Sequence, residues 1–153
     1  MTEVFRTRNI AGTPAEVWEV LSDFGAISKW APNVDHSSLQ QQPGGPDLAS
    51  LGLVRRIQTG RRTLLERVVR WDEPRALAYE IEGLPKVVRS LRNEWTLVVD
   101  GDTGTTATLA TRLDCGPRPP QQLGARILGR RLAKESDQLL LGLAHFMEDR
   151  VRG

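Results

Sequence analysis

The spacing of hydrophobic residues changes three times along the chain, and each change marks a switch between strands and helices. Residues 3–10 alternate, although imperfectly, and predict a first strand. Thr13-Pro14-Ala15-Glu16 has the residues of a helix start: an N-cap, a proline at the first helical position and a capping-box glutamate. Apolar residues at helical spacing extend this helix to about residue 22. A second brief helix is expected around Ile27 and Trp30, before Pro32 stops it.

From residue 34 to residue 113 the pattern is that of strands separated by turns. Strands are expected near 34–41, 51–59, 62–71, 77–81, 87–99 and 105–113. Turn residues separate them, at Gly44-Gly45-Pro46, Gly60, Glu73-Pro74, Gly83-Leu84-Pro85 and Asp100-Gly101-Asp102-Thr103-Gly104. Because strands joined by short turns pair antiparallel, this stretch predicts an antiparallel meander.

The end of the chain returns to helical spacing. An apolar stripe covers roughly thirty residues, at Leu123, Ile127, Leu132, Leu139, Leu143 and Phe146. Such a helix would be ~40 Å long, enough to cross a small domain. Its stripe and one face of the sheet must each be buried, and each is the obvious partner of the other. We therefore predict one α+β domain over residues 1–153: a curved antiparallel sheet of six to seven strands, two short helices after the first strand, and a long C-terminal helix.

A twisted sheet coils, so a helix laid along its concave side leaves space between the two. That space is where an apolar ligand would bind.

Composition narrows the classes of partner. The 153 residues carry a net charge of only +2, which gives no strong electrostatic reason to expect nucleic acid or an anionic membrane. The first residues lack a secretion signal, and no apolar run approaches the ~20 residues that span a bilayer. The single cysteine, Cys115, excludes an internal disulfide. We expect a cytoplasmic protein without nucleic-acid partner or stable membrane insertion.

Few residues suggest chemistry outside the expected pocket. His36 and His145 are far apart and have no converging ligand set, so no metal site is expected. Cys115 has no recognisable catalytic partner, which favours a structural thiol. No phosphate-binding glycine loop is present, and no cofactor is expected. A basic run on the last helix contains Arg126, Arg130, Arg131 and Lys134, and positions 126, 130 and 134 share one face, which suggests a solvated or anion-facing stripe.

The order of elements resembles that of the START/Bet v 1-like superfamily, most closely its polyketide cyclase/dehydrase branch. The residues that carry the resemblance are Thr13-Pro14-Ala15-Glu16-Val17-Trp18, Leu21-Ser22-Asp23-Phe24, Trp30-Ala31-Pro32, Glu66-Arg67-Val68, Trp71-Asp72-Glu73-Pro74, Leu77-Ala78-Tyr79, Trp95-Thr96-Leu97 and Gly104-Thr105-Thr106. The resemblance covers essentially the whole chain. It implies a helix-grip fold with a pocket for a lipid, sterol, polyketide or similar apolar molecule. We expect a monomer or a homodimer. Some relatives cyclise, aromatise or dehydrate a bound polyketide, whereas many others only carry, sense or sequester a ligand.

Glu66 is the candidate catalytic residue. By strand alternation Leu64, Glu66 and Val68 share one face, while Leu65, Arg67, Val69 and Trp71 share the other. In ligand-binding relatives with a similar Glu-Arg pair the glutamate points into the pocket, so the resemblance places Glu66 inward and Arg67 outward. An inward Glu66 is a general base or a ligand acceptor; the alternative is an ion pair with a neighbouring arginine at the pocket rim.

Other candidate ligand-binding residues follow from strand parity and from the helix stripe; they are Tyr79, Ile81, Asn93, Trp95, Leu97, Leu139 and Leu143. Tyr79 is either a ligand contact or a core tyrosine. Asn93 is either a polar anchor inside the cavity or a residue at its wet end. Trp95 is the candidate to stack on a planar ligand, and its alternative is a core position.

Three hypotheses follow. The first is a carrier or sensor of a small apolar molecule, and the alternative is a polyketide cyclase/aromatase-like enzyme in which Glu66, Tyr79 and Asn93 converge. In the third, side chains fill the pocket completely. The sparse polar set favours binding over catalysis.

Overall fold

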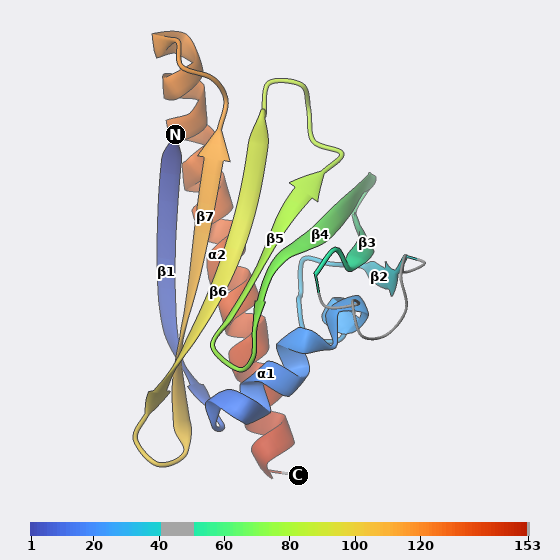
Figure 1. The fold of residues 1–153 in the computed structure, drawn as a ribbon, viewed down its shortest axis with the longest axis vertical. Coiled ribbons are helices and arrows are strands. Elements are labelled where there is room, and N and C mark those ends of the chain that lie inside the picture. The colour runs from blue at the N-terminus through green and yellow to red at the C-terminus, as the bar shows by residue number, and fades with distance from the viewer. Residues whose placement is uncertain (41–50, 153) are drawn as a thin grey trace.

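The computed structural model describes residues 1–40 and 51–152. Its elements, labelled in Figure 1, are β1 (Thr2–Ala11), α1 (Pro14–Ser22), the 3-10 helix η1 (Phe24–Lys29), β2 (His36–Leu39), β3 (Val54–Thr59), β4 (Arg62–Asp72), β5 (Ala76–Glu82), β6 (Ser90–Asp100), β7 (Gly104–Asp114) and α2 (Pro119–Arg152). The strands form one seven-stranded antiparallel sheet in the order β1-β7-β6-β5-β4-β3-β2.

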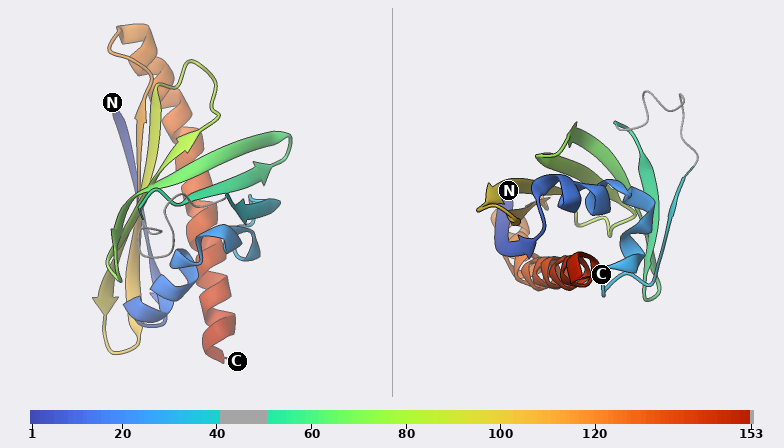
Figure 2. Two further views of the ribbon diagram at one scale, coloured as in Figure 1. Left: turned by 45° about the vertical axis from the view of Figure 1, so that its right-hand side comes forward. Right: turned by 90° about the horizontal axis from the view of Figure 1, so that it is seen from below.

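The sheet curves around α2, as the end-on view of Figure 2 shows. The 34-residue α2 lies along the concave side, and α1 lies across the lower end in Figure 1. This arrangement confirms the predicted helix-grip fold and its long C-terminal helix. The strand predicted near 34–41 is shorter, at His36–Leu39, and the predicted turn Gly44-Gly45-Pro46 lies outside the described residues. No described helix is long and apolar enough to cross a membrane.

The start of α1 is formed by the predicted capping box. The Thr13 hydroxyl accepts a hydrogen bond from the Glu16 backbone N–H at 3.2 Å, and the Glu16 carboxylate accepts one from the Thr13 N–H at 3.0 Å. Two backbone donors that the helix itself leaves free are thereby satisfied. The apolar face of α1, which includes Val17, Trp18 and Leu21, then packs into the core.

Two hairpins fix which residues face one another in the sheet. Gly60, with φ of +61°, turns the chain so that Thr59 pairs with Arg62, and this register sets Arg55 opposite Glu66. The turn between β6 and β7 likewise sets Asn93 opposite Thr111. Residues from distant parts of the sequence are thus aligned across neighbouring strands.

An irregularity in β4 corrects one prediction. Simple alternation placed Trp71 on the face opposite Glu66. The register between β4 and β5 shifts between Val68 and Arg70, which inserts one extra residue and reverses the facing of those that follow. Trp71 consequently faces inward and packs edge-on against Trp18, with ring centroids 5.2 Å apart.

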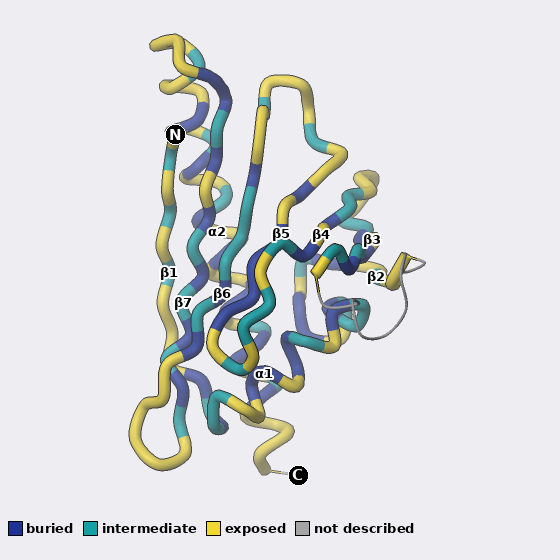
Figure 3. The backbone as a smooth tube through the Cα atoms, in the orientation of Figure 1, coloured by how far each residue is buried: buried dark blue, intermediate teal, exposed yellow. Residues whose placement is uncertain are grey.

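The packed core lies towards the lower end of the sheet. Figure 3 shows the buried part of β5 and β6 beside α1, and the exposed part nearer the upper loops. Leu77, Trp95 and Leu109 occupy matching positions on three neighbouring strands, and each is at most 1% exposed. On α2, Leu143 and Met147 are fully buried against this region. Above it, side chains do not fill the space.

Candidate functional site

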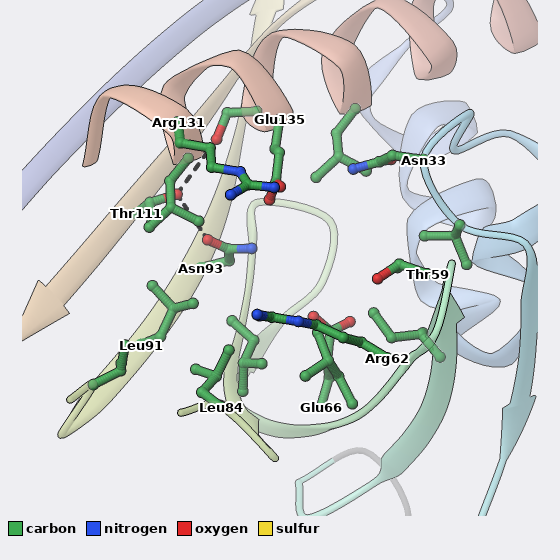
Figure 4. A pocket seen from close by; sticks show the side chains of 18 of the residues that line it. Asn33, Thr59, Arg62, Glu66, Leu84, Leu91, Asn93, Thr111, Arg131 and Glu135 are labelled. Atoms are coloured by element: carbon green, nitrogen blue, oxygen red, sulfur yellow. Dashed lines mark hydrogen bonds between the residues drawn. The ribbon is translucent and has the colours of Figure 1, made fainter. Parts of the chain in front are cut away.

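A cavity of about 560 Å³ lies between the concave face of the sheet and α2 (Figure 4). Its walls come from η1, β3 to β7, the β5–β6 loop and the middle of α2. The apolar part of the lining includes Ile57, Leu64, Ile81, Leu91, Leu132 and Leu139. The volume is within the range of ~300–1,000 Å³ that small-molecule sites occupy. The hypothesis of a completely filled pocket is therefore wrong for the described residues.

One wall of the cavity carries a chain of hydrogen bonds with a defined direction. The Thr111 hydroxyl donates to the Asn93 carbonyl oxygen at 2.7 Å, so its proton is used there. Ser136 on α2, with its hydroxyl 3.5 Å from that of Thr111, must therefore be the donor of that pair. The Asn93 amide in turn points its N–H towards the Tyr79 hydroxyl, at 3.5 Å.

The Tyr79 hydroxyl is the end of this chain. It also accepts from the Trp95 indole N–H at 3.3 Å, and an indole nitrogen can only donate. With two groups donating to its oxygen, Tyr79 must donate its own proton elsewhere. No hydrogen bond donated by Tyr79 is formed to any residue that the structure describes. Tyr79 lines the cavity, so it can offer this proton to an acceptor on a ligand.

Burial keeps that proton in place. Removal from water raises the pKa of the Tyr79 phenol above its ordinary value, and the negative charge of nearby Glu66 raises it further, while Arg55 acts in the opposite direction. Tyr79 is therefore a hydrogen-bond donor at neutral pH, not a phenolate base.

Glu66 faces the cavity and Arg67 faces outward, as predicted. Glu66 is 5% exposed and lines the cavity, whereas Arg67 is exposed and pairs with Glu82 at 3.6 Å. The Glu66 carboxylate is not free, because its Oε1 accepts from the Arg55 Nε at 2.7 Å. The predicted alternative was an ion pair at the pocket rim. The pair is instead buried on the inner face of the sheet, where Arg55 packs against Phe24 of η1.

Arg55 binds the Glu66 side chain but was not among the site residues predicted from the sequence. Its guanidinium stacks on the Phe24 ring at 3.8 Å and lies 4.6 Å from the Tyr79 ring centroid. Nη1 donates to the Phe24 carbonyl oxygen at 3.1 Å, and Nη2 has no partner among the described residues. The sequence could have predicted this pair, because a two-residue turn at Gly60-Arg61 necessarily sets position 55 opposite position 66.

The other predicted ligand-binding residues divide between cavity and core. Tyr79, Ile81, Asn93 and Leu139 line the cavity. Trp95, Leu97 and Leu143 do not, and lie in the packed core. Trp95 in particular is 1% exposed, lies outside the cavity lining and forms a T-shaped pair with Trp30, with centroids 5.9 Å apart, so it is not placed to stack on a planar ligand. Thr111, Ser136, Arg62 and Arg131 also line the cavity and were not among the predicted site residues.

The thiol and the two histidines belong to no cluster of metal-ligating side chains in the part of the chain that the structure describes. Cys115 is buried, and burial raises the pKa of its thiol, with the adjacent Asp114 adding to the shift. It therefore stays protonated and unreactive at neutral pH. Within residues 1–40 and 51–152 no three metal-ligating side chains cluster.

A sheet curved over one long helix, with a cavity between them, defines a helix-grip protein. The chain belongs to the family described as polyketide cyclase/dehydrase and lipid transport, whose model matches residues 1–148. No curated protein matches the sequence.

Solved structures give the same fold. The aromatase/cyclase Zhui from Streptomyces sp. R1128 superposes with a TM-score of 0.80 at 19% identity, over 99% of this chain and 96% of that one. A protein from Thermobifida fusca gives 0.73 at 27% identity, over 94% and 91%. A START superfamily protein from Mycobacterium smegmatis gives 0.73 at 14% identity, over 96% and 97%. At 19% and 14% identity, the first and third likenesses establish the fold alone.

Proposed function

We propose that this protein binds a small, largely apolar molecule in the cavity between the sheet and α2, as a carrier or sensor. The observation that carries the proposal is the directional chain from Ser136 through Thr111 and Asn93 to Tyr79, which leaves one phenol proton without an acceptor among residues 1–40 and 51–152. A buried donor without a partner costs about 1–3 kcal/mol, so a ligand that accepts this proton is favoured. We expect the ligand to carry a carbonyl, ether or carboxylate oxygen at its inner end.

The rest of the lining supports the same reading. The remaining wall is mostly aliphatic, so it favours the body of an apolar molecule without directing its orientation. The polar chain then fixes one end of that molecule. Zhui, whose fold this chain shares, is named an aromatase/cyclase, and the family description includes lipid transport. Both point to ligands of this kind.

The second candidate is a cyclase/aromatase-like enzyme. It is favoured by one observation, that Glu66, Tyr79 and Asn93 all line the same cavity, as an enzyme of this kind would require. Against it, Arg55 occupies one Glu66 oxygen, so only the other oxygen is left to act as a general base. Binding without turnover is therefore the function we put first.

Native mass spectrometry of freshly purified protein tests the proposal. We expect a co-purified small molecule at one per chain, which is released on unfolding. As a second arm, a panel of aromatic and polyketide-like ketones should raise the melting temperature, and Tyr79→Phe should weaken their binding about tenfold while sparing hydrocarbons of the same shape. A protein that is always empty and that no apolar compound stabilises contradicts both functions.

The same preparation separates carrier from enzyme. The extracted ligand, returned to ligand-free protein, should be recovered unchanged if the protein is a carrier or sensor. Cyclisation followed by dehydration would remove one water from its mass. In that case Glu66→Gln should abolish the change while it preserves binding, and unchanged turnover in that variant would exclude Glu66 as the base.

A further inference from the structure

The cavity carries an excess of positive charge. Three arginines line it, Arg61, Arg62 and Arg131, together with two carboxylates, Glu66 and Glu135. Because Arg55 offsets Glu66 inside the sheet, the three lining arginines face only Glu135, which leaves a balance of two positive charges. An apolar cavity with this balance is better suited to an anionic ligand than to a neutral one.

The three lining arginines have no carboxylate partner among the described residues. On the outer surface, Arg67 pairs with Glu82, Arg70 with Glu94, and Arg112 with Glu3. In contrast, Arg61, Arg62 and Arg131 form no ion pair within residues 1–40 and 51–152. Glu135 lies one helical turn from Arg131 on α2 but is not bonded to it. Other basic residues, such as Arg8 and Arg56, also lack an ion pair in the described part of the chain, but these three line the cavity, where an anionic ligand can reach them.

Arg62 and Arg131 extend into the same cavity from opposite walls, the sheet and the helix. Arg62 begins β4 and Arg131 lies on α2, and Figure 4 shows both side chains reaching into the cavity from different walls. Both residues are exposed, whereas Tyr79 is 1% exposed. The cations are therefore at the mouth, and the phenol donor is at the inner end.

We propose that the ligand is an organic anion, with its charged group between Arg62 and Arg131 and its apolar body directed inward towards Tyr79. This inference rests on the proposed binding function and adds the chemical class of the ligand. Guanidinium groups bind carboxylate, sulfonate and phosphate oxygens through paired N–H donors, so the two arginines select for the charge and the cavity selects for the apolar body.

Two fluorescent probes that differ in one charged group test the inference. Anilinonaphthalene sulfonate and phenylnaphthylamine share an aromatic frame, and only the first carries an anionic group. We expect both to bind, the sulfonate about tenfold more tightly at low salt, and to compete for one site. The preference should shrink as ionic strength rises through ~0.1 M, where charges at an exposed mouth are screened.

Variants of Arg62 and Arg131 test whether these two residues cause the tighter binding of the sulfonate probe. The double variant Arg62→Gln/Arg131→Gln should bind both probes equally while its affinity for phenylnaphthylamine is unchanged. Each single variant should lose about threefold in sulfonate affinity. The matched control is Arg126→Gln/Arg130→Gln, which removes the same charge from α2 at positions outside the cavity lining and should keep the preference.

The outcomes separate the two proposals. If neither probe binds to the wild-type protein, the proposed binding function fails. If phenylnaphthylamine binds but the sulfonate is not preferred, or if the preference persists in Arg62→Gln/Arg131→Gln, the binding function stands and the inference about the anion is overturned.

Discussion

The lower and upper halves of this protein use the same strands and the same helix in opposite ways. Leu77, Trp95 and Leu109 form one row across β5, β6 and β7, and all three are buried without a gap. The next inward-facing row, one pleat or about 7 Å further up, is Tyr79, Asn93 and Thr111. This row replaces hydrocarbon with a phenol, an amide and a hydroxyl that border empty space.

The helix shows the same division. Leu143 and Met147 of α2 are fully buried, whereas Leu132 and Leu139, higher on the helix, border the cavity. The difference lies in what covers each half. Trp30 packs onto Trp95 at the lower end, and no comparable aromatic side chain among the described residues fills the upper end. Stability is thus concentrated in one half of the fold, which leaves the other half free to form a binding site.

Truncating one leucine in each half tests this division most strongly. We expect Leu143→Ala to lower the free energy of unfolding by about 4 kcal/mol, because it opens a void where every neighbour is in contact. Leu139→Ala should cost only about 2 kcal/mol, because Leu139 already borders a void and loses fewer contacts. Urea unfolding, followed by tryptophan fluorescence, measures both.

The slope of each unfolding curve is the control. Equal m-values for the two variants show that the surface exposed on unfolding is unchanged, so the midpoints can be compared directly. Equal losses in the two variants would mean that the cavity collapses in solution, and the division into packed and open halves would be contradicted.

On β5 and β6 the alternation predicted which face points inward, but not which end of that face is open. Alternation put Tyr79, Asn93, Trp95 and Leu97 on one inner surface, and it did so correctly. Trp95 and Leu97 nevertheless lie in the core, because η1 and α2 close over the lower end and not the upper. That closure depends on contacts between distant segments, which strand parity does not contain.

Local rules succeeded where the chain itself fixes the geometry. The capping box at Thr13 and Glu16 needs only four consecutive residues and was predicted in full. The buried pair of Arg55 and Glu66 needed one further step, from the Gly60 turn to the register. Trp71 was misplaced because nothing in the alternation of residues 64–71 announces the irregularity after Val68.

Gly142 and Gly124 of α2 allow the effect of Gly→Ala to be compared between the lower and the upper half. At Gly142 an added Cβ would collide with the Trp30 carbonyl oxygen and with Pro32, so Gly142→Ala should cost about 1–3 kcal/mol. At Gly124 nothing lies within 4 Å of an added Cβ, so Gly124→Ala should stabilise the protein by about 0.5–1 kcal/mol through helix propensity alone. Thermal unfolding of both variants gives the comparison, and a loss at Gly124 would show that the upper half is more tightly packed than its structure indicates.

Tyr79, where the two halves meet, predicts how the protein responds to high pH. Its phenol has a pKa raised by burial from the ordinary 10.0, so above pH 10 the unfolded chain releases this proton while the folded protein retains it. The stabilisation is complete below pH 10 and is lost as the pH rises towards the folded pKa. Because Tyr79 is the only tyrosine, the ultraviolet absorbance of phenolate reports this residue alone.

We expect little phenolate until the protein unfolds. In Tyr79→Phe, the free energy of unfolding should fall less steeply as the pH rises above 10. Titration at the ordinary pKa in the folded state would mean that water reaches the phenol freely, and the boundary between core and cavity would then lie below Tyr79.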